Sequence, residues 1–252
     1  MAKNIIFIPC VPSKHLSDVD DYKDYSLNTW KHYAHRIGAE LMIMDTPLRD
    51  PDMMKICWQR WYVHDILESN DIEYDNIFMV DVDTMVRWDA PDIFERYSND
   101  KLRACVDNDN LGWLKASIEG YQHMFTGVEL DWETYFNCGA ILMSKKHKDL
   151  CKEITTFYEE NESHLLDLQH NTLKKGSDQT PVNYILNGDK WKYELLPKKW
   201  NLTHMNRKEV LHDFLFTDIA WVWHFNGFDK ALRKQVMYSF WDYYRGNYEI
   251  KK

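Results

Sequence analysis

The sequence predicts an α/β protein with a mixed, mainly parallel sheet that carries helices on its faces. Short apolar runs typical of strands alternate with longer segments in which apolar residues recur at helical spacing. The first strands are expected at residues 4–8, 40–44 and 77–80, and the helices between them at about 26–37 and 53–69. This alternation indicates the start of a doubly wound sheet with parallel strands.

The second half of the chain continues the pattern less regularly. Further strands are expected at 102–106, within 135–144, and at 191–196 and 220–224, and further helices at 92–97, 145–173, 177–186 and 230–245. Asn137 and Gly139 predict a turn that feeds a strand. Residues 113–126 fit no period and are expected to form a flexible loop over a cleft. No linker or repeat divides the chain, so one domain over 1–252 is predicted.

Composition narrows the class of protein. The eleven tryptophans indicate an aromatic-rich core or an aromatic-lined cleft. A net charge of −9 argues against a general nucleic-acid binder, although a metal ion can still create a local site for a nucleotide. The five scattered cysteines, with no Cys-x-x-Cys pair, indicate reduced thiols. With no apolar run near 20 residues and no signal peptide, a cytoplasmic protein is expected.

Two carboxylates follow the most apolar of the predicted strands. Asp81 and Asp83 stand one residue apart directly after 77–80, at the strand end where open α/β sheets bind ligands. Burying two unpaired acids costs roughly several kcal/mol unless a cation or hydrogen bonds compensate them. A divalent metal ion that carries a phosphate would do so. An isolated pair of this kind is also compatible with a solvated loop or a helix cap.

Three other segments offer groups that suit the same chemistry. His224, Gly227 and Lys230 lie within seven residues after a late strand and offer a metal ligand, an accessible main chain and a cation for phosphate. Carboxylate oxygens with an imidazole suit Mn²⁺ or Mg²⁺. Asn137 could hold sugar hydroxyls, as could Asp178 with Gln179 at the positive start of a helix.

These segments, taken in order, resemble the nucleotide-sugar-dependent glycosyltransferases of the GT-A (Rossmann-like) fold, and most closely glycosyltransferase family 8, which includes glycogenin-like and lipopolysaccharide galactosyltransferase-like enzymes. The resemblance covers about residues 3 to 235. Its motifs are Phe78-Met-Val-Asp-Val-Asp-Thr-Met-Val86, Phe136-Asn-Cys-Gly-Ala-Ile-Leu142, Asp178-Gln179 with Asn183, Leu196-Pro-Lys-Lys-Trp-Asn201 and His224-x-x-Gly227-x-x-Lys230.

The resemblance implies a role for each matching position. Asp81, Asp83 and His224 would ligate Mn²⁺ (or Mg²⁺) together with the donor diphosphate. Gly227 and Lys230 would bind the phosphates, and Asn137 would contact the donor sugar or its ribose side. Arg60 corresponds to the family's basic residue near the donor, with Lys55 as a rival. The implied donor-binding set is Pro9, Arg60, Asp81, Val82, Asn137, Gly227 and Lys230.

The implied reaction is transfer of a hexose from a UDP-sugar, UDP-galactose or UDP-glucose, to an acceptor hydroxyl with retention of anomeric configuration. Gln179 would face the anomeric carbon. It is no ordinary nucleophile, which favours front-face attack by the acceptor, and Asp178 is the candidate if a covalent intermediate forms. The acceptor would be a carbohydrate, a lipid-linked glycan or a protein.

Some features depart from the family or leave alternatives open. Pro9-Cys-Val-Pro12 stands where relatives often carry an acid that holds uracil, and Ala231-Leu232 follows Lys230 in place of Pro-Trp. A non-catalytic nucleotide-sugar or glycan-binding domain of the same fold is the main alternative. A sugar-1-phosphate nucleotidyltransferase would need a Gly-rich loop after the first strand, which is lacking. The helix at 230–245 could cover the sheet or make peripheral contact with a membrane.

Overall fold

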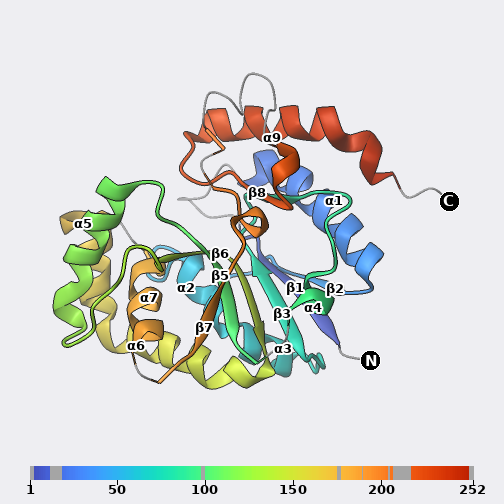
Figure 1. Ribbon diagram of the computed structural model, residues 1–252. Coiled ribbons are helices and arrows are strands. Elements are labelled where there is room, and N and C mark those ends of the chain that lie inside the picture. Colours follow the sequence, from blue (N-terminus) through green and yellow to red (C-terminus); the bar gives the residue numbers. More distant parts are fainter. Residues whose placement is uncertain are drawn as a thin grey trace.

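The computed structural model describes residues 3–11, 19–97, 100–174, 177–188, 190–203, 205–206 and 217–249 (Figure 1). Its main sheet has six strands, in the order β2 (Glu40–Met44), β1 (Asn4–Pro9), β3 (Asn76–Val80), β6 (Phe136–Ser144), β5 (Leu102–Val106) and β7 (Tyr193–Leu196). Only β6 runs antiparallel to its neighbours. The predicted α/β class with a mixed, mainly parallel sheet is confirmed; the domain limits 1–252 stay a prediction.

Helices cover both faces of this sheet because side chains alternate along its strands. Ile6 and Phe78 face a core shared with α1 (Val19–Ile37) and α9 (Lys230–Tyr244). Ile5 and Ile77 face a second core, to which the contributing helices are α2 (Ile56–Gln59), α3 (Val63–Ser69), α5 (Leu111–Tyr121), α6 (Lys148–Asp167) and α7 (Gln179–Asn187). Figure 1 shows the two groups on opposite sides of the sheet. The predicted aromatic-rich core is present, with fully buried Trp30, Trp58, Trp61, Trp200 and Trp223.

A second, two-stranded sheet lies beside the main one. Its strands are β4 (Thr84–Val86) and β8 (Val222–His224), which run antiparallel with Thr84 opposite His224. Thr84 anchors the turn from β3 into β4, because its hydroxyl donates to the Asp81 carbonyl at 2.6 Å and accepts from the Trp30 indole at 3.0 Å. This small sheet brings a late segment of the chain to the end of β3.

Four local expectations differ from the structure. The helix expected at 26–37 begins at Val19, so residues 19–25 are helical too. Residues 113–126 are mostly helical, in α5 and the short turn Gln122–Met124. Asn137 and Gly139 lie inside β6 and form no turn. The helix at 53–69 is shorter and is interrupted by a tighter 3₁₀ turn, Arg60–Tyr62.

The C-terminal helix expected at 230–245 is confirmed as α9. Val236, Met237 and Phe240 are buried against the first core, so this helix covers the sheet. Leu232, Tyr238 and Tyr243 stay exposed on its outer side. Among the described residues, no helix combines the length and apolar character needed to cross a bilayer. The sequence-based expectations of a cytoplasmic location and of peripheral membrane contact stay predictions.

A buried histidine in α3 makes the stability of the fold depend on pH. Burial lowers the pKa of His64 from 6.5 to about 4, where its Nδ1 lies 2.8 Å from the Tyr74 hydroxyl. The folded protein therefore favours neutral His64. The contribution of this residue to the free energy of unfolding is complete above pH 6.5 and is lost as the pH falls through 4. At about 1.4 kcal/mol per pKa unit, we expect this loss to approach about 3 kcal/mol.

Urea unfolding at pH 7.5 and at pH 4.5 tests this expectation. His64→Gln should reduce the difference in unfolding free energy between the two pH values, since glutamine does not titrate. His35→Gln serves as the control, because His35 lies on α1 and is exposed. An equal pH dependence in wild type and His64→Gln would contradict the assignment.

Candidate functional site

Two carboxylates leave the carboxyl end of β3, as the sequence predicts. The Asp81 N–H donates to the Gly139 carbonyl at 2.9 Å, which extends the pairing of β3 with β6. The Val82 side chain turns into the core, while the Asp83 carbonyl accepts from the Phe225 N–H at 2.8 Å. The main chain thus fixes both acids on either side of a buried valine.

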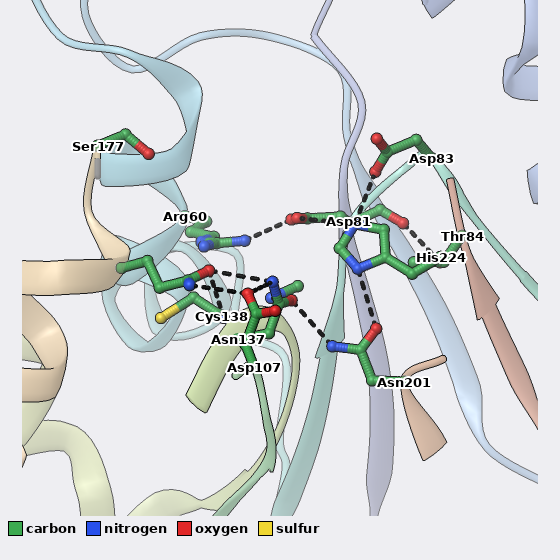
Figure 2. Close-up of polar contacts among 12 residues, drawn as sticks. Arg60, Asp81, Asp83, Thr84, Asp107, Asn137, Cys138, Ser177, Asn201 and His224 are labelled. Atoms are coloured by element: carbon green, nitrogen blue, oxygen red, sulfur yellow. Dashed lines mark hydrogen bonds and ion pairs between the residues drawn. The ribbon is translucent and has the colours of Figure 1, made fainter. Parts of the chain in front are cut away.

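His224 joins the two acids from β8. Its Nε2 lies 3.2 Å from Asp83 Oδ1 and 3.7 Å from Asp81 Oδ2. One ligand atom from each residue lies within 4.8 Å of the others, and Figure 2 shows the imidazole directed at both carboxylates. Two carboxylate oxygens with one imidazole nitrogen form a donor set that suits Mn²⁺ or Mg²⁺. The residues therefore fit the metal implied by the sequence.

Burial and the neighbouring charges shift the pKa of all three groups in this cluster. Burial raises the pKa of the Asp81 carboxyl, and the charges of Arg60 and His224 offset this only in part. Burial acts on Asp83 in the same sense, but the charge and hydrogen bond of His224 outweigh it and lower the pKa of Asp83 to about 2. Burial alone would lower the pKa of His224, but the carboxylates of Asp83 and Asp81 outweigh this effect, and the pKa is raised. The carboxylates thus favour positive charge at this position.

Arg60 connects Asp81 to the start of α7. Its guanidinium donates to Asp81 Oδ1 and, at 2.6 Å, to Asp178 Oδ2, which also accepts from the Trp61 indole at 3.0 Å. Both Arg60 and Asp178 are buried. Asp178 occupies the N-cap position of α7, but its side chain makes no capping hydrogen bond there. Arg60, rather than its rival Lys55, is the base that contacts the predicted metal ligands.

A network of amides lies on the other side of the acids. Asn137 Nδ2 donates to Asp107 Oδ2 at 2.9 Å and to Gln179 Oε1 at 3.0 Å, and Gln179 Nε2 donates to the same Asp107 oxygen at 3.0 Å. Asn137 Oδ1 accepts from Asn201 Nδ2 at 2.9 Å, and Asn201 Oδ1 contacts His224 Nδ1 at 2.9 Å. Figure 2 shows this path from Asp107 to the imidazole.

Gly139 explains how these groups approach β6 so closely. A Cβ atom at this position would lie 2.3 Å from His224 Cε1 and 2.8 Å from both Asp81 Oδ2 and Asn137 Oδ1. Pairing with β5 is irregular here: Ala104 pairs with Ile141 and Cys105 with Asn137. The glycine and the irregular register together leave space for the ligands against the strand.

The remaining predicted residues lie on other elements. Pro9 is the buried last residue of β1. Gly227 has a positive φ of 70° and, with Asn137 and Gln179, lines a cavity of about 230 Å³. Lys230 is the exposed first residue of α9. The other residues that line the cavity are Asp107, Asn110, Trp113, Asn206 and Asn226.

Sequence reasoning assigned no role to three residues at the site. Asp107 follows β5, and its place after a strand parallel to β3 was a usable signal. Asn201 lies within the Leu196–Asn201 motif, but its spacing from His224 says nothing about contact. Arg233 Nη1 lies 3.8 Å from Asp83 Oδ2, and no sequence pattern indicates this.

Removing the Arg60 guanidinium should strongly destabilise the fold. Arg60→Met would leave Asp178 buried without its main cation, and we expect the free energy of unfolding to fall by about 3–5 kcal/mol. Arg49→Met is the matched control, because Arg49 pairs with Glu162 but its side chain is 38% exposed, and it should cost less than about 1 kcal/mol. Urea unfolding measures both; equal effects would contradict a buried ion pair at Arg60.

The mixed α/β sheet, the Asp-x-Asp turn at the carboxyl end of β3 and the histidine that returns to it agree with the arrangement that the resemblance to GT-A glycosyltransferases implies. The sequence profile described as "Glycosyl transferase family 8" matches residues 13–233. The chain therefore belongs to glycosyl transferase family 8. A search of curated protein sequences gave no significant match.

Solved structures agree on the fold. A glycosyltransferase involved in glycosylation of the major capsid of PBCV-1 aligns with a TM-score of 0.57 and 15% identity, covering 94% of this chain and 99% of the other. The galactosyltransferase LgtC, in complex with donor and acceptor sugar analogs, aligns with a TM-score of 0.50 and 14% identity over 96% and 99%. Mouse xyloside xylosyltransferase 1 aligns with a TM-score of 0.51 and 10% identity over 89% and 98%.

Proposed function

We propose that this glycosyltransferase is metal-dependent and moves a hexose from a UDP-sugar, UDP-galactose or UDP-glucose, to an acceptor hydroxyl. The convergence of Asp81, Asp83 and His224 within 4.8 Å carries the proposal. These three residues would hold Mn²⁺ or Mg²⁺, which supplies charge neutralisation for the diphosphate as it leaves. Family membership supports a nucleotide-sugar donor, and the donor set supports the metal.

The chain's own residues divide the remaining tasks. Gly227, in a left-handed conformation, would present main-chain N–H groups to the diphosphate, and Lys230 would add a cation. Pro9 and Val82 are proposed to border the nucleotide. The carboxylate and amide groups around the 230 Å³ cavity suit sugar hydroxyls, with Asn137 and Gln179 closest to the metal ligands along the hydrogen-bond network.

The groups that are proposed to face the sugar support retention of configuration. Gln179 is held by the Asn137 amide at 3.0 Å and by the Cys138 N–H at 3.3 Å, and an amide oxygen is no ordinary nucleophile. Asp178 already accepts from Arg60 and Trp61, which supports a role in positioning. The acceptor oxygen would therefore bond to the anomeric carbon on the face that the diphosphate leaves. Its proton would pass to the departing phosphate oxygen.

A screen of nucleotide sugars tests donor and metal together. Calorimetry with UDP-galactose, UDP-glucose and, as a control, GDP-mannose should show binding of a UDP-sugar that needs Mn²⁺ and is lost with EDTA. Slow hydrolysis or transfer should follow only for the donor that binds. Binding of a UDP-sugar without turnover with any acceptor would instead support the alternative, a non-catalytic nucleotide-sugar or glycan-binding domain.

The acceptor is proposed to be a carbohydrate, a lipid-linked glycan or a protein; Trp113 and the polar groups that line the cavity support a carbohydrate. NMR of the product made with a simple glycoside acceptor reads the anomeric configuration directly, and inversion would contradict the proposed mechanism. The exposed Leu232, Tyr238 and Tyr243 of α9 support peripheral contact with a membrane. Sedimentation with anionic vesicles tests this contact separately.

A further inference from the structure

One hydrogen-bonded path links the main chain of β6 to the imidazole of His224. The Gly139 N–H donates to Asn137 Oδ1 at 2.8 Å, and Asn201 Nδ2 donates to the same oxygen at 2.9 Å. The other end of the Asn201 amide lies 2.9 Å from His224 Nδ1. Asn137, Asn201 and His224 are at most 4% exposed, so water does not compete for these contacts.

The main chain determines the direction of every bond on this path. A backbone N–H can only donate, so the oxygen of Asn137 must face Gly139. Asn201 must then present its NH₂ group to that oxygen and its own oxygen to His224. Asp107, which can only accept when ionised, receives the NH₂ group of Asn137 at 2.9 Å and sets the same orientation from the other side.

We propose that Asn201 is a positioning residue that keeps the proton of His224 on Nδ1 and so directs the Nε2 lone pair at the site between Asp81 and Asp83. This inference rests on the metal-ligand role that the proposed function gives to His224. A neutral imidazole binds a metal through one nitrogen only, and the hydrogen bond at the other nitrogen decides which one. Here the oxygen of the Asn201 amide contacts Nδ1 and so leaves Nε2 as the nitrogen that would bind the metal.

Asn137 extends the consequence to the sugar cavity. Its NH₂ group contacts Asp107 and Gln179, which line the cavity, while its oxygen holds Asn201. A single amide therefore orients both the group that faces the sugar and the support of the metal ligand. We infer that the cavity and the metal centre share one rigid network rather than two independent supports.

Metal binding and the position of the proton test the role of Asn201. Mn²⁺ is titrated in the presence of UDP and free Mn²⁺ is followed by electron paramagnetic resonance. Asn201→Leu, which keeps the volume and removes the acceptor, should weaken Mn²⁺ binding roughly 10- to 100-fold. Asn201→Asp keeps an acceptor for Nδ1–H but loses the donor to Asn137 Oδ1, so it should weaken Mn²⁺ binding less than Asn201→Leu does. Asn76→Leu is the matched control, because Asn76 is a buried asparagine at the opposite end of β3.

Nitrogen NMR of ¹⁵N-histidine-labelled wild type with Mg²⁺ and UDP reads the position of the proton on the imidazole directly. The signals of His224 are those missing from His224→Gln, and the proton should be on Nδ1. A proton on Nε2, or an unchanged Mn²⁺ affinity in Asn201→Leu, would overturn the role of Asn201 while leaving the proposed function intact. Wild type that binds no Mn²⁺ with UDP would overturn both.

Discussion

Asp83→Asn is expected to lower Mn²⁺-dependent turnover of a UDP-sugar by roughly 1,000-fold, since stabilisation of the leaving diphosphate is the largest single contribution expected in such a site. The amide keeps the shape of the side chain, so the fold should persist. Asp83 lies 3.2 Å from His224 Nε2, and the change would therefore remove both a proposed metal ligand and the negative charge that would attract the cation.

Asp89→Asn is the matched control for this experiment. Asp89 also pairs with a cation, Arg87, but lies after β4 and contacts no member of the metal cluster. Turnover with saturating donor and a Mn²⁺ titration should change little in this variant. Turnover retained by Asp83→Asn across the Mn²⁺ titration would remove Asp83 from the metal site.

Gly139→Ala is expected to disrupt the site through sterics alone, without removing any ligand. The new methyl group would lie 2.3 Å from His224 Cε1 and 2.8 Å from Asp81 Oδ2. At these distances both the imidazole and the carboxylate must move away from the methyl group. We expect Mn²⁺ affinity in the presence of UDP to fall by at least roughly 100-fold, since ligand geometry is lost. Overpacking should also cost about 1–3 kcal/mol of unfolding free energy.

Gly246→Ala separates this effect from the general consequence of adding a methyl group. Apart from the adjoining main chain, no atom of the described residues lies within 4 Å of the corresponding Cβ position at Gly246, so neither stability nor Mn²⁺ affinity should change appreciably. Calorimetric titration and thermal unfolding measure the two quantities for both variants. A Gly139→Ala protein that binds Mn²⁺ like wild type would show that the imidazole does not need to lie against β6.

The sequence is informative wherever a pattern is local. The apolar run before Asp81 predicts a buried strand, and β3 lies where it is expected. The alternation of strand and helix predicts the class of the sheet, because each element buries one face against the next. The family motifs also predict which segments meet, and the structure brings Asp81, Asp83 and His224 together.

Other features depend on distant partners and leave no local signal. Gly139 and Asn137 read as turn residues, yet the strand continues through them because Ala140 pairs with β3 and Asn137 with β5. Residues 113–126 show weak periodicity, and α5 forms there because Leu114 and Tyr121 are buried against the rest of the fold. Such tertiary contacts override local preference.

The site contains the same division between local and distant information. The position of Asp178 at the start of a helix predicts a capping residue. In the structure its carboxylate accepts from the buried Arg60 guanidinium and makes no capping hydrogen bond. The Asn201 amide contacts a histidine 23 positions later, and Arg233 reaches Asp83 across 150 positions. Spacing along the chain cannot predict contacts that the path of the backbone creates.

The pairing of β4 with β8 determines when, during synthesis, the proposed metal centre can be completed. All six strands of the main sheet have been synthesised once residue 196 has been added, yet His224 lies beyond them and enters through the separate two-stranded sheet. A nascent chain halted between these points has two of the three proposed ligands. The proposed metal centre would thus be completed later in synthesis than the sheet that supports it, and only after the chain has been made through β8.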